Sequence, residues 1–77
     1  MSMIVEEARE ILKTIYNVPE YAPRFQFVLY TIDKRTGALW FYGAYSDGVH
    51  AGLVAYAVDG CVLDMYTGRV HSKEDLI

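Results

Sequence analysis

The chain has 77 residues and a formal net charge of −3; hydrophobic residues make up 53% of it and charged residues 22%. This balance excludes an intrinsically disordered chain, and the length fits one domain over residues 1–77. The seven Lys and Arg residues are scattered along an acidic chain, so nucleic acid is not an expected partner.

The sequence carries no mark of export or of membrane insertion. No apolar run approaches the ~20 residues that cross a bilayer, and the N-terminus lacks the basic and apolar regions of a secretion signal. A single cysteine, Cys61, excludes an internal disulfide framework and fits a reducing compartment. These features predict a cytoplasmic protein without a membrane partner.

The first predicted element is an amphipathic helix over residues 3–16. Apolar residues recur at the spacing of one helical face: Ile4, Ala8, Ile11, Leu12 and Ile15. The pattern ends at Asn17 and cannot continue past Pro19. Residues 17–23 contain both prolines of the chain and are expected to form a connector.

Four strands are predicted to follow, over residues 24–32, 38–45, 50–58 and 61–70. The pair Asp59-Gly60 is typical of a two-residue hairpin turn, which makes the last two strands neighbours. The predicted fold is therefore α+β, with one N-terminal helix packed on a four-stranded antiparallel β-meander.

The turn pattern Asp-x-x-Thr-Gly occurs twice, at residues 33–37 and 64–68. In each copy the Asp side chain can accept hydrogen bonds from backbone amides, and the Gly can adopt a positive φ. We interpret the repeat as two uses of the same turn. A turn at 64–68 would split the last strand, so the continuity of the segment 61–70 is left open.

Successive side chains of a strand point to opposite faces of the sheet, and in the predicted strands both sets of side chains are apolar, so both faces of the sheet are apolar. The helix can cover one of them, which we expect to be the face of Phe27, Leu29, Leu39 and Phe41. The other face would carry four aromatic residues that tolerate partial exposure and suit an interface: Tyr30, Trp40, Tyr42 and Tyr56. These four are the predicted partner-binding residues.

No pattern in the chain points to catalysis, a cofactor or a metal. It contains no phosphate-binding loop, nucleophile elbow, zinc spacing or dinucleotide fingerprint. In the predicted meander His50 lies too far from Cys61 to act as its base, so Cys61 is interpreted as a buried structural thiol. His50 and His71 would approach each other only along a continuous last strand, and both are interpreted as surface residues.

Two segments carry a family resemblance: Val58-Asp59-Gly60 and Asp64-Met65-Tyr66-Thr67-Gly68-Arg69-Val70. They resemble the PepSY-type small domains, whose last hairpin reads approximately D-x-x-T-G-x-V, and Asp64, Thr67, Gly68 and Val70 match it. The order of elements is also similar to that of small cystatin-like bacterial immunity proteins. Both resemblances imply a non-catalytic module, of bacterial or phage type, that inhibits or regulates a partner protein.

The sequence therefore predicts a small non-catalytic binding or regulatory protein that acts as a homodimer through its aromatic sheet face. The alternative is a small-ligand-binding domain with a pocket between helix and sheet. The residues expected to line that pocket are Tyr16, Tyr21, Phe27, Phe41 and Tyr45. A third alternative, an enzyme that uses His50 and Asp47, has no motif in its favour.

Overall fold

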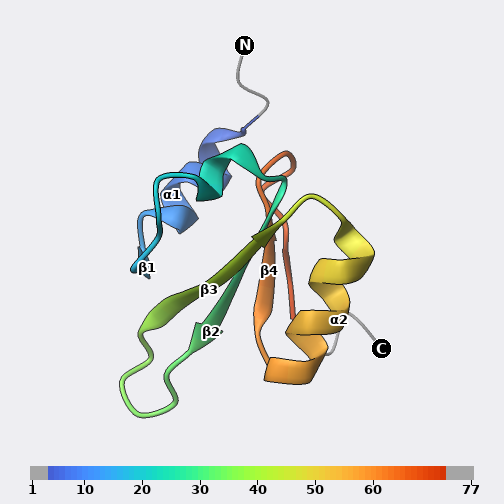
Figure 1. The fold of residues 1–77 in the computed structure, drawn as a ribbon. Coiled ribbons are helices and arrows are strands. Elements are labelled where there is room, and N and C mark those ends of the chain that lie inside the picture. The colour runs from blue at the N-terminus through green and yellow to red at the C-terminus, as the bar shows by residue number, and fades with distance from the viewer. Residues whose placement is uncertain (1–3, 73–77) are drawn as a thin grey trace.

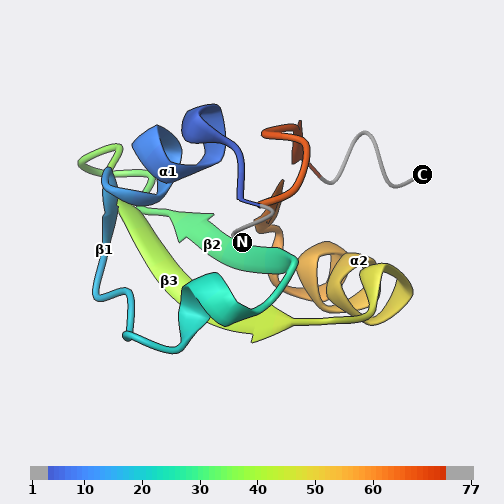
Figure 2. The ribbon, with the colours of Figure 1, turned by 90° about the horizontal axis from the view of Figure 1, so that it is seen from above.

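The computed structural model describes residues 4–72, which form a five-stranded mixed sheet with two α-helices. In chain order the elements are α1 (Glu6–Leu12), β1 (Ile15–Tyr16), the 3₁₀ turn η1 (Ala22–Arg24), β2 (Phe27–Ile32), β3 (Leu39–Tyr45), α2 (Gly48–Val58), β4 (Cys61–Asp64) and β5 (Val70–His71). The strand order is β1-β3-β2-β4-β5, in which β1 runs parallel to β3 and the other pairs are antiparallel. Figure 1 shows α1 beside β1 and α2 beside β4, and Figure 2 shows the two helices well apart when seen from above.

The α+β class is confirmed, but the four-stranded antiparallel meander with one helix is wrong. Residues 50–58, predicted as the third strand, form most of the helix α2. This helix begins at an N-cap, where the Asp47 carboxylate accepts a hydrogen bond from the Val49 N–H at 2.9 Å. It ends at Asp59, whose φ of 57° is left-handed, and the Gly60 N–H then donates to the Ala55 carbonyl oxygen at 2.9 Å. Asp59-Gly60 thus ends a helix and does not turn a hairpin.

Because a helix separates β3 from β4, these strands are not hairpin partners. β4 instead pairs antiparallel with β2, with Cys61 opposite Tyr30 and Leu63 opposite Val28. The strand predicted over 24–32 begins only at residue 27, since residues 22–24 form η1, and it becomes the central strand of the sheet. The strand predicted over 38–45 is confirmed as β3, over 39–45.

The N-terminal helix is shorter than the predicted range 3–16; residue 3 lies outside the described residues, and α1 spans 6–12. The helix ends early because Thr14 competes for its last carbonyls. Both its N–H and its hydroxyl donate to the Ile11 carbonyl oxygen, at 2.9 and 2.6 Å. Ile15 and Tyr16 then extend and pair in parallel with the first two residues of β3.

The predicted strand 61–70 is split at residues 64–68 into β4 and β5, and both Asp-x-x-Thr-Gly segments form the same turn. The Gly37 N–H donates to the Asp33 carbonyl oxygen at 2.7 Å, and the Gly68 N–H donates to the Asp64 carbonyl oxygen at 2.8 Å. Both glycines have a φ of 78°. The interpretation of the repeat as one turn used twice is therefore confirmed by the hydrogen bonds.

The two turns have different surroundings. The first closes the β2–β3 hairpin, which extends away from both helices at the lower left of Figure 1. The second lies against the start of α1, because the Val5 N–H donates to the Met65 carbonyl oxygen at 3.0 Å. The Met65 N–H also donates to the Gln26 carbonyl oxygen at 2.7 Å, and the Met65 side chain is fully buried. The second turn thus joins α1 to the sheet.

The two helices cover opposite faces of the sheet. On the face we call the α1 face, Ala8 packs in one buried cluster with Val28, Tyr30 and Leu63. On the α2 face, the strand residues that alternate with these pack against α2, in a second buried cluster made of Leu29, Ala51, Ala55 and Val62. The structure is therefore three layers, helix, sheet and helix.

The face expected to lie under the N-terminal helix is split between the two layers. Leu39 and Phe41 pack on the α1 side, whereas Phe27 and Leu29 pack on the α2 side. The reason is the register of β2 with β3, which places Tyr30 opposite Phe41. Alternation within one strand cannot reveal this register, because it depends on which residues of the next strand lie opposite.

Candidate interaction surface

Half of the α2 face of the sheet has no helix over it. α2 packs on Leu29 of β2 and Val62 of β4 and meets β3 at Tyr45, the last residue of that strand, so the rest of β3 and the edge strand β1 remain open on this side. Three aromatic side chains, each between 45% and 58% exposed, lie on these two strands: Tyr16, Trp40 and Tyr42. We call these three residues the aromatic ledge.

Strand pairing positions the ledge. Tyr16 lies beside Trp40 in the parallel β1–β3 pair, and their ring centroids are 5.2 Å apart. Trp40 is opposite Thr31, which shares its face with Leu29 because Thr31 is at position i+2 from Leu29 on β2. Both rings therefore belong to the same side of the sheet as α2.

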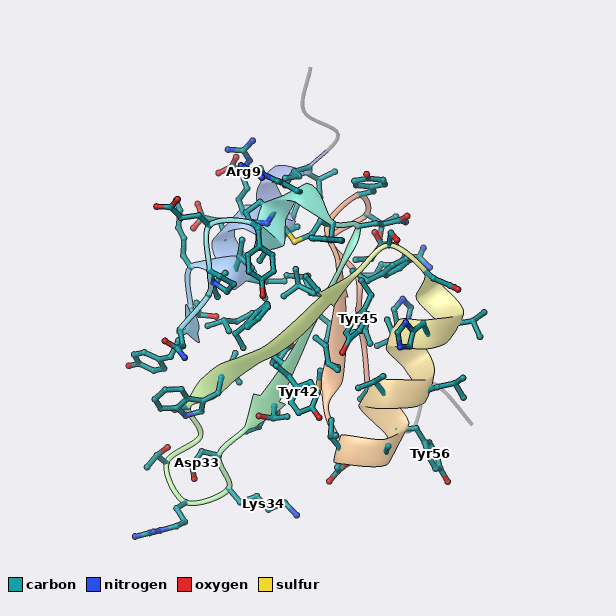
Figure 3. All side chains as sticks on the ribbon, in the orientation of Figure 1. Arg9, Asp33, Lys34, Tyr42, Tyr45 and Tyr56 are labelled. Atoms are coloured by element: carbon teal, nitrogen blue, oxygen red, sulfur yellow. The ribbon has the colours of Figure 1, made fainter. Side chains whose placement is uncertain are left out.

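A bulge in β3 positions Tyr42. Leu29 pairs with Gly43 and Tyr30 pairs with Phe41, so Tyr42 is the extra residue between the two pairs. Tyr45, two residues beyond Gly43, folds back over it: a Cβ atom at residue 43 would lie 2.7 Å from the Tyr45 hydroxyl oxygen. In Figure 3 the Tyr42 and Tyr45 side chains extend from β3 in the same general direction. Burial, and secondarily the neighbouring Tyr42 hydroxyl, raises the pKa of Tyr45.

Tyr45 also links the ledge to α2. Its ring packs edge-on against the imidazole of His50 in the first turn of α2, with centroids 4.8 Å apart. The open half of the sheet therefore runs without interruption into the side of the helix.

The outward side of α2 is apolar as well. The residues Gly48–Val58 include no Asp, Glu, Lys or Arg. Val49 and Leu53 are 73% and 67% exposed, Tyr56 is about half exposed, and the three follow the i, i+4, i+7 spacing of one helical face. Figure 3 shows Tyr56 directed away from the sheet. We call Val49, Leu53 and Tyr56 the α2 ridge; a shallow groove of about 380 Å³ runs beside it over Gly48 and Gly52.

The four predicted partner-binding residues do not form one surface. Trp40 and Tyr42 lie on the aromatic ledge, and Tyr56 lies on the α2 ridge. Tyr30 does not belong with them, because it is only 5% exposed and packs on the opposite face under α1. Its register partner is Phe41 and not a residue of the ledge.

Sequence reasoning missed Val49 and Leu53, because it placed Leu53 in the predicted strand 50–58 and Val49 outside every predicted element. The pattern that identifies them is an eleven-residue stretch without Asp, Glu, Lys or Arg, bounded by Asp47 and Asp59. Within that stretch Ala51 and Ala55 are fully buried and four residues apart, as on a helix.

The residues proposed for a ligand pocket are also divided between faces. Phe41 packs on the α1 side, where its ring meets the Tyr21 ring edge-on with ring centroids 6.3 Å apart. Phe27 and Tyr45 pack on the α2 side, and Tyr16 belongs to the ledge. A different hollow of about 320 Å³ lies beside α1. Its lining combines apolar and charged residues: Ile4, Glu6, Arg9, Leu12, Lys13, Pro23 and Met65.

The titratable groups considered for chemistry are separated. Cys61 is half-buried beside Tyr30, and burial, with a smaller contribution from the Cys61 thiol, raises the pKa of Tyr30 to about 12. His50 is in α2, whereas His71 is in β5 opposite Val62, so the continuous strand that would have brought the histidines together does not exist. Within residues 4–72 no three His, Cys, Asp or Glu side chains are grouped so that they could hold a metal ion.

Comparison of the chain with protein-family models, with curated proteins and with solved structures gave no match. The resemblance to PepSY-type domains and to cystatin-like immunity proteins therefore stays a prediction. Among the described helices, none has the length and apolar character needed to cross a membrane.

Proposed function

We propose that the chain is a non-catalytic protein-binding module, and that its partner docks on the aromatic ledge and the α2 ridge. The observation that carries the proposal is that α2 exposes large apolar side chains on the side opposite its own core contacts. A helix that is apolar all round is normally covered on all sides, so the exposed side of α2 is expected to be covered in the functional state.

The composition of the ledge supports a protein partner. Tyr and Trp are enriched in the centres of protein interfaces, where charged residues are depleted. Each ledge residue combines a ring for apolar contact with a hydroxyl or indole N–H for a hydrogen bond. Other half-exposed apolar side chains, such as Ile32 and Tyr21, are separated from the ledge, and single exposed residues of this kind are ordinary.

A photo-crosslinking amino acid placed at the surface tests this function. We expect p-benzoylphenylalanine at Tyr42 or at Leu53 to form protein-sized adducts in cells of the native host after irradiation. The matched control is the same amino acid at Ile32, which is as exposed as Tyr42 but has its side chain on the α1 face. Equal adducts from Ile32, or none from Tyr42 and Leu53, would contradict the proposal.

A second candidate function is the binding of a small amphipathic molecule in the hollow beside α1. Its volume of about 320 Å³ is at the lower end of the range for ligand sites, and Arg9 and Lys13 stand beside apolar Leu12 and Met65. Native mass spectrometry of protein purified from its host tests it. A bound small molecule that is lost in Leu12→Trp would support this function. Protein that carries no bound molecule would exclude it.

A further inference from the structure

We infer that the partner on this surface is a second copy of the chain, arranged reciprocally, with the α2 ridge of each copy on the aromatic ledge of the other. The inference rests on the proposed function, since it names the occupant of the same surface. It is carried by the spacing of helices on a sheet, by the orientation of the exposed side of α2, and by the area available.

The spacing of the layers leaves room for one more helix. Packed helices lie about 8–10 Å apart and neighbouring strands about 4.8 Å apart, so one helix covers roughly two strands. α2 packs on β2 and β4 and contacts β3 only at its last residue, Tyr45. The next two strands in the sheet, β3 and β1, carry the ledge and can accommodate a second helix parallel or antiparallel to α2. α1 does not occupy this place because it lies on the other face.

The exposed side of α2 has the orientation that a second sheet requires. Ala51, Ala55 and Val58 face the helix's own sheet, and the α2 ridge lies on the far side of the helical wheel. Two copies related by a two-fold axis would place two α2 helices side by side between two sheets. Each helix would then contact its own sheet with one side and the partner's ledge with the other, so both apolar sides of α2 are covered.

The area points to reciprocal contact rather than to either patch alone. A whole aromatic side chain presents ~200 Å² and a Leu or Val roughly half of that, so each patch exposes on the order of 250–350 Å². A stable interface buries about 800 Å² per partner. In a two-fold arrangement both patches of each copy are buried, which supplies most of this area, and the polar atoms around them supply the rest.

The chemistry of the contact permits two identical surfaces to meet. The ridge carries no charge and the ledge presents no Asp, Glu, Lys or Arg side chain, so no like charges are opposed. Gly52, which has no side chain, leaves the groove beside the ridge open to a ring from the partner. The Tyr16 and Tyr42 hydroxyls can reach water at the edge of the interface.

Sedimentation velocity tests this inference. We expect the wild-type chain at ~100 µM to sediment at twice its mass of 8.8 kDa. Leu53→Lys on the ridge and Tyr42→Glu on the ledge should each weaken the dimer roughly 100-fold or more, as for residues at the centre of an interface. The matched control Ile32→Glu, on the α1 face, should remain a dimer, and circular dichroism should show every variant folded.

Mixing the two variants tests the reciprocal arrangement. One of the two contacts in a mixed dimer joins the new Lys to the new Glu, and the other is wild-type, so Leu53→Lys plus Tyr42→Glu should restore a heterodimer. Failure to restore it would overturn the reciprocal pairing. A wild-type monomer at ~100 µM would overturn the inference that the partner is a second copy of the chain. If Tyr42 then crosslinks to a different protein, the proposed protein-binding function still stands. A dimer that neither variant weakens would contradict both.

Discussion

The two copies of the Asp-x-x-Thr-Gly turn offer a matched test of how the second copy joins α1 to the sheet. Gly37 and Gly68 share the same left-handed φ of 78° and the same hydrogen bond within the turn. A Cβ atom at Gly37 would have no neighbour within 4 Å. A Cβ atom at Gly68 would lie 3.1 Å from the Glu7 Cβ and 3.3 Å from a Val5 methyl group. Replacing each glycine by Ala therefore imposes the same backbone strain but a different contact.

The strain of an Ala in the left-handed region is about 1–2 kcal/mol, and this is the whole expected loss for Gly37→Ala. Gly68→Ala adds the overpacking against α1, about 1–3 kcal/mol more. Urea denaturation followed by circular dichroism measures both losses, and for a domain of this size each kcal/mol lowers the Tm by about 4–8 °C. Gly37→Asn, which tolerates the left-handed region, should lose less than Gly37→Ala.

Equal losses of unfolding free energy in Gly37→Ala and Gly68→Ala would refute this reasoning, because the second turn would then not be packed against α1. A larger loss in Gly37→Ala would refute it more strongly. The hydrogen bond that each glycine N–H donates to the Asp carbonyl oxygen cannot produce the difference, since it is present in both copies.

Three further predictions follow from the structure. In α2, Ala55 is fully buried and Ala57 is exposed, so Ala55→Leu should cost about 1–3 kcal/mol of unfolding free energy, whereas Ala57→Leu should change it by no more than ~0.5 kcal/mol. Equal losses in urea denaturation would favour a strand, because residues 55 and 57 share a face in a strand but not in a helix. Asp47→Ala removes the N-cap of α2 and should cost about 1 kcal/mol in the same assay, whereas Asp47→Ser should recover most of it. Burial raises the pKa of Tyr30 from 10.0 to about 12, so between these pH values the unfolded chain loses a proton that the folded chain keeps. The unfolding free energy should therefore fall by up to about 2–3 kcal/mol as the pH rises through this range. If the fall persists in Tyr30→Phe, a group other than Tyr30 causes it.

The sequence correctly predicted those helices and strands whose hydrophobic pattern fits only one type of secondary structure. The helix that carries Ala8, Ile11 and Leu12 and the aromatic strand that ends at Ile32 are both present, with ends shifted by a few residues. The two-residue strand β1 could not be predicted, because it is extended only by pairing with the start of β3. Tertiary pairing, and not local propensity, determines such a segment.

The error at α2 had a different cause. Val54, Tyr56 and Val58 alternate as in a strand, and Asp59-Gly60 is typical of a hairpin, yet the fully buried Ala51 and Ala55 repeat at helical spacing. Both periods are present in the same eleven residues because nearly all of them are apolar, so periodicity alone could not decide between helix and strand.

The same ambiguity limited the prediction of the surface. Trp40, Tyr42 and Tyr56 belong to the ledge and ridge, because large half-exposed aromatic residues are conspicuous in any secondary structure. Tyr30 was misplaced because its face depends on the register with β3, and Leu53 was missed because its exposure depends on α2 being a helix. A surface that joins a sheet to a helix cannot be assembled until both are placed.

Isotope-filtered NMR on a mixture of labelled and unlabelled protein tests the central claim most directly, since the chain is only 77 residues long. In a sample that is half ¹³C-labelled, the reciprocal dimer predicts nuclear Overhauser effects from the Leu53 methyl groups of one copy to the Trp40 or Tyr42 ring protons of the other. Intermolecular effects that join Leu53 to Leu53 alone, or the absence of any intermolecular effect at concentrations near 1 mM, would contradict it.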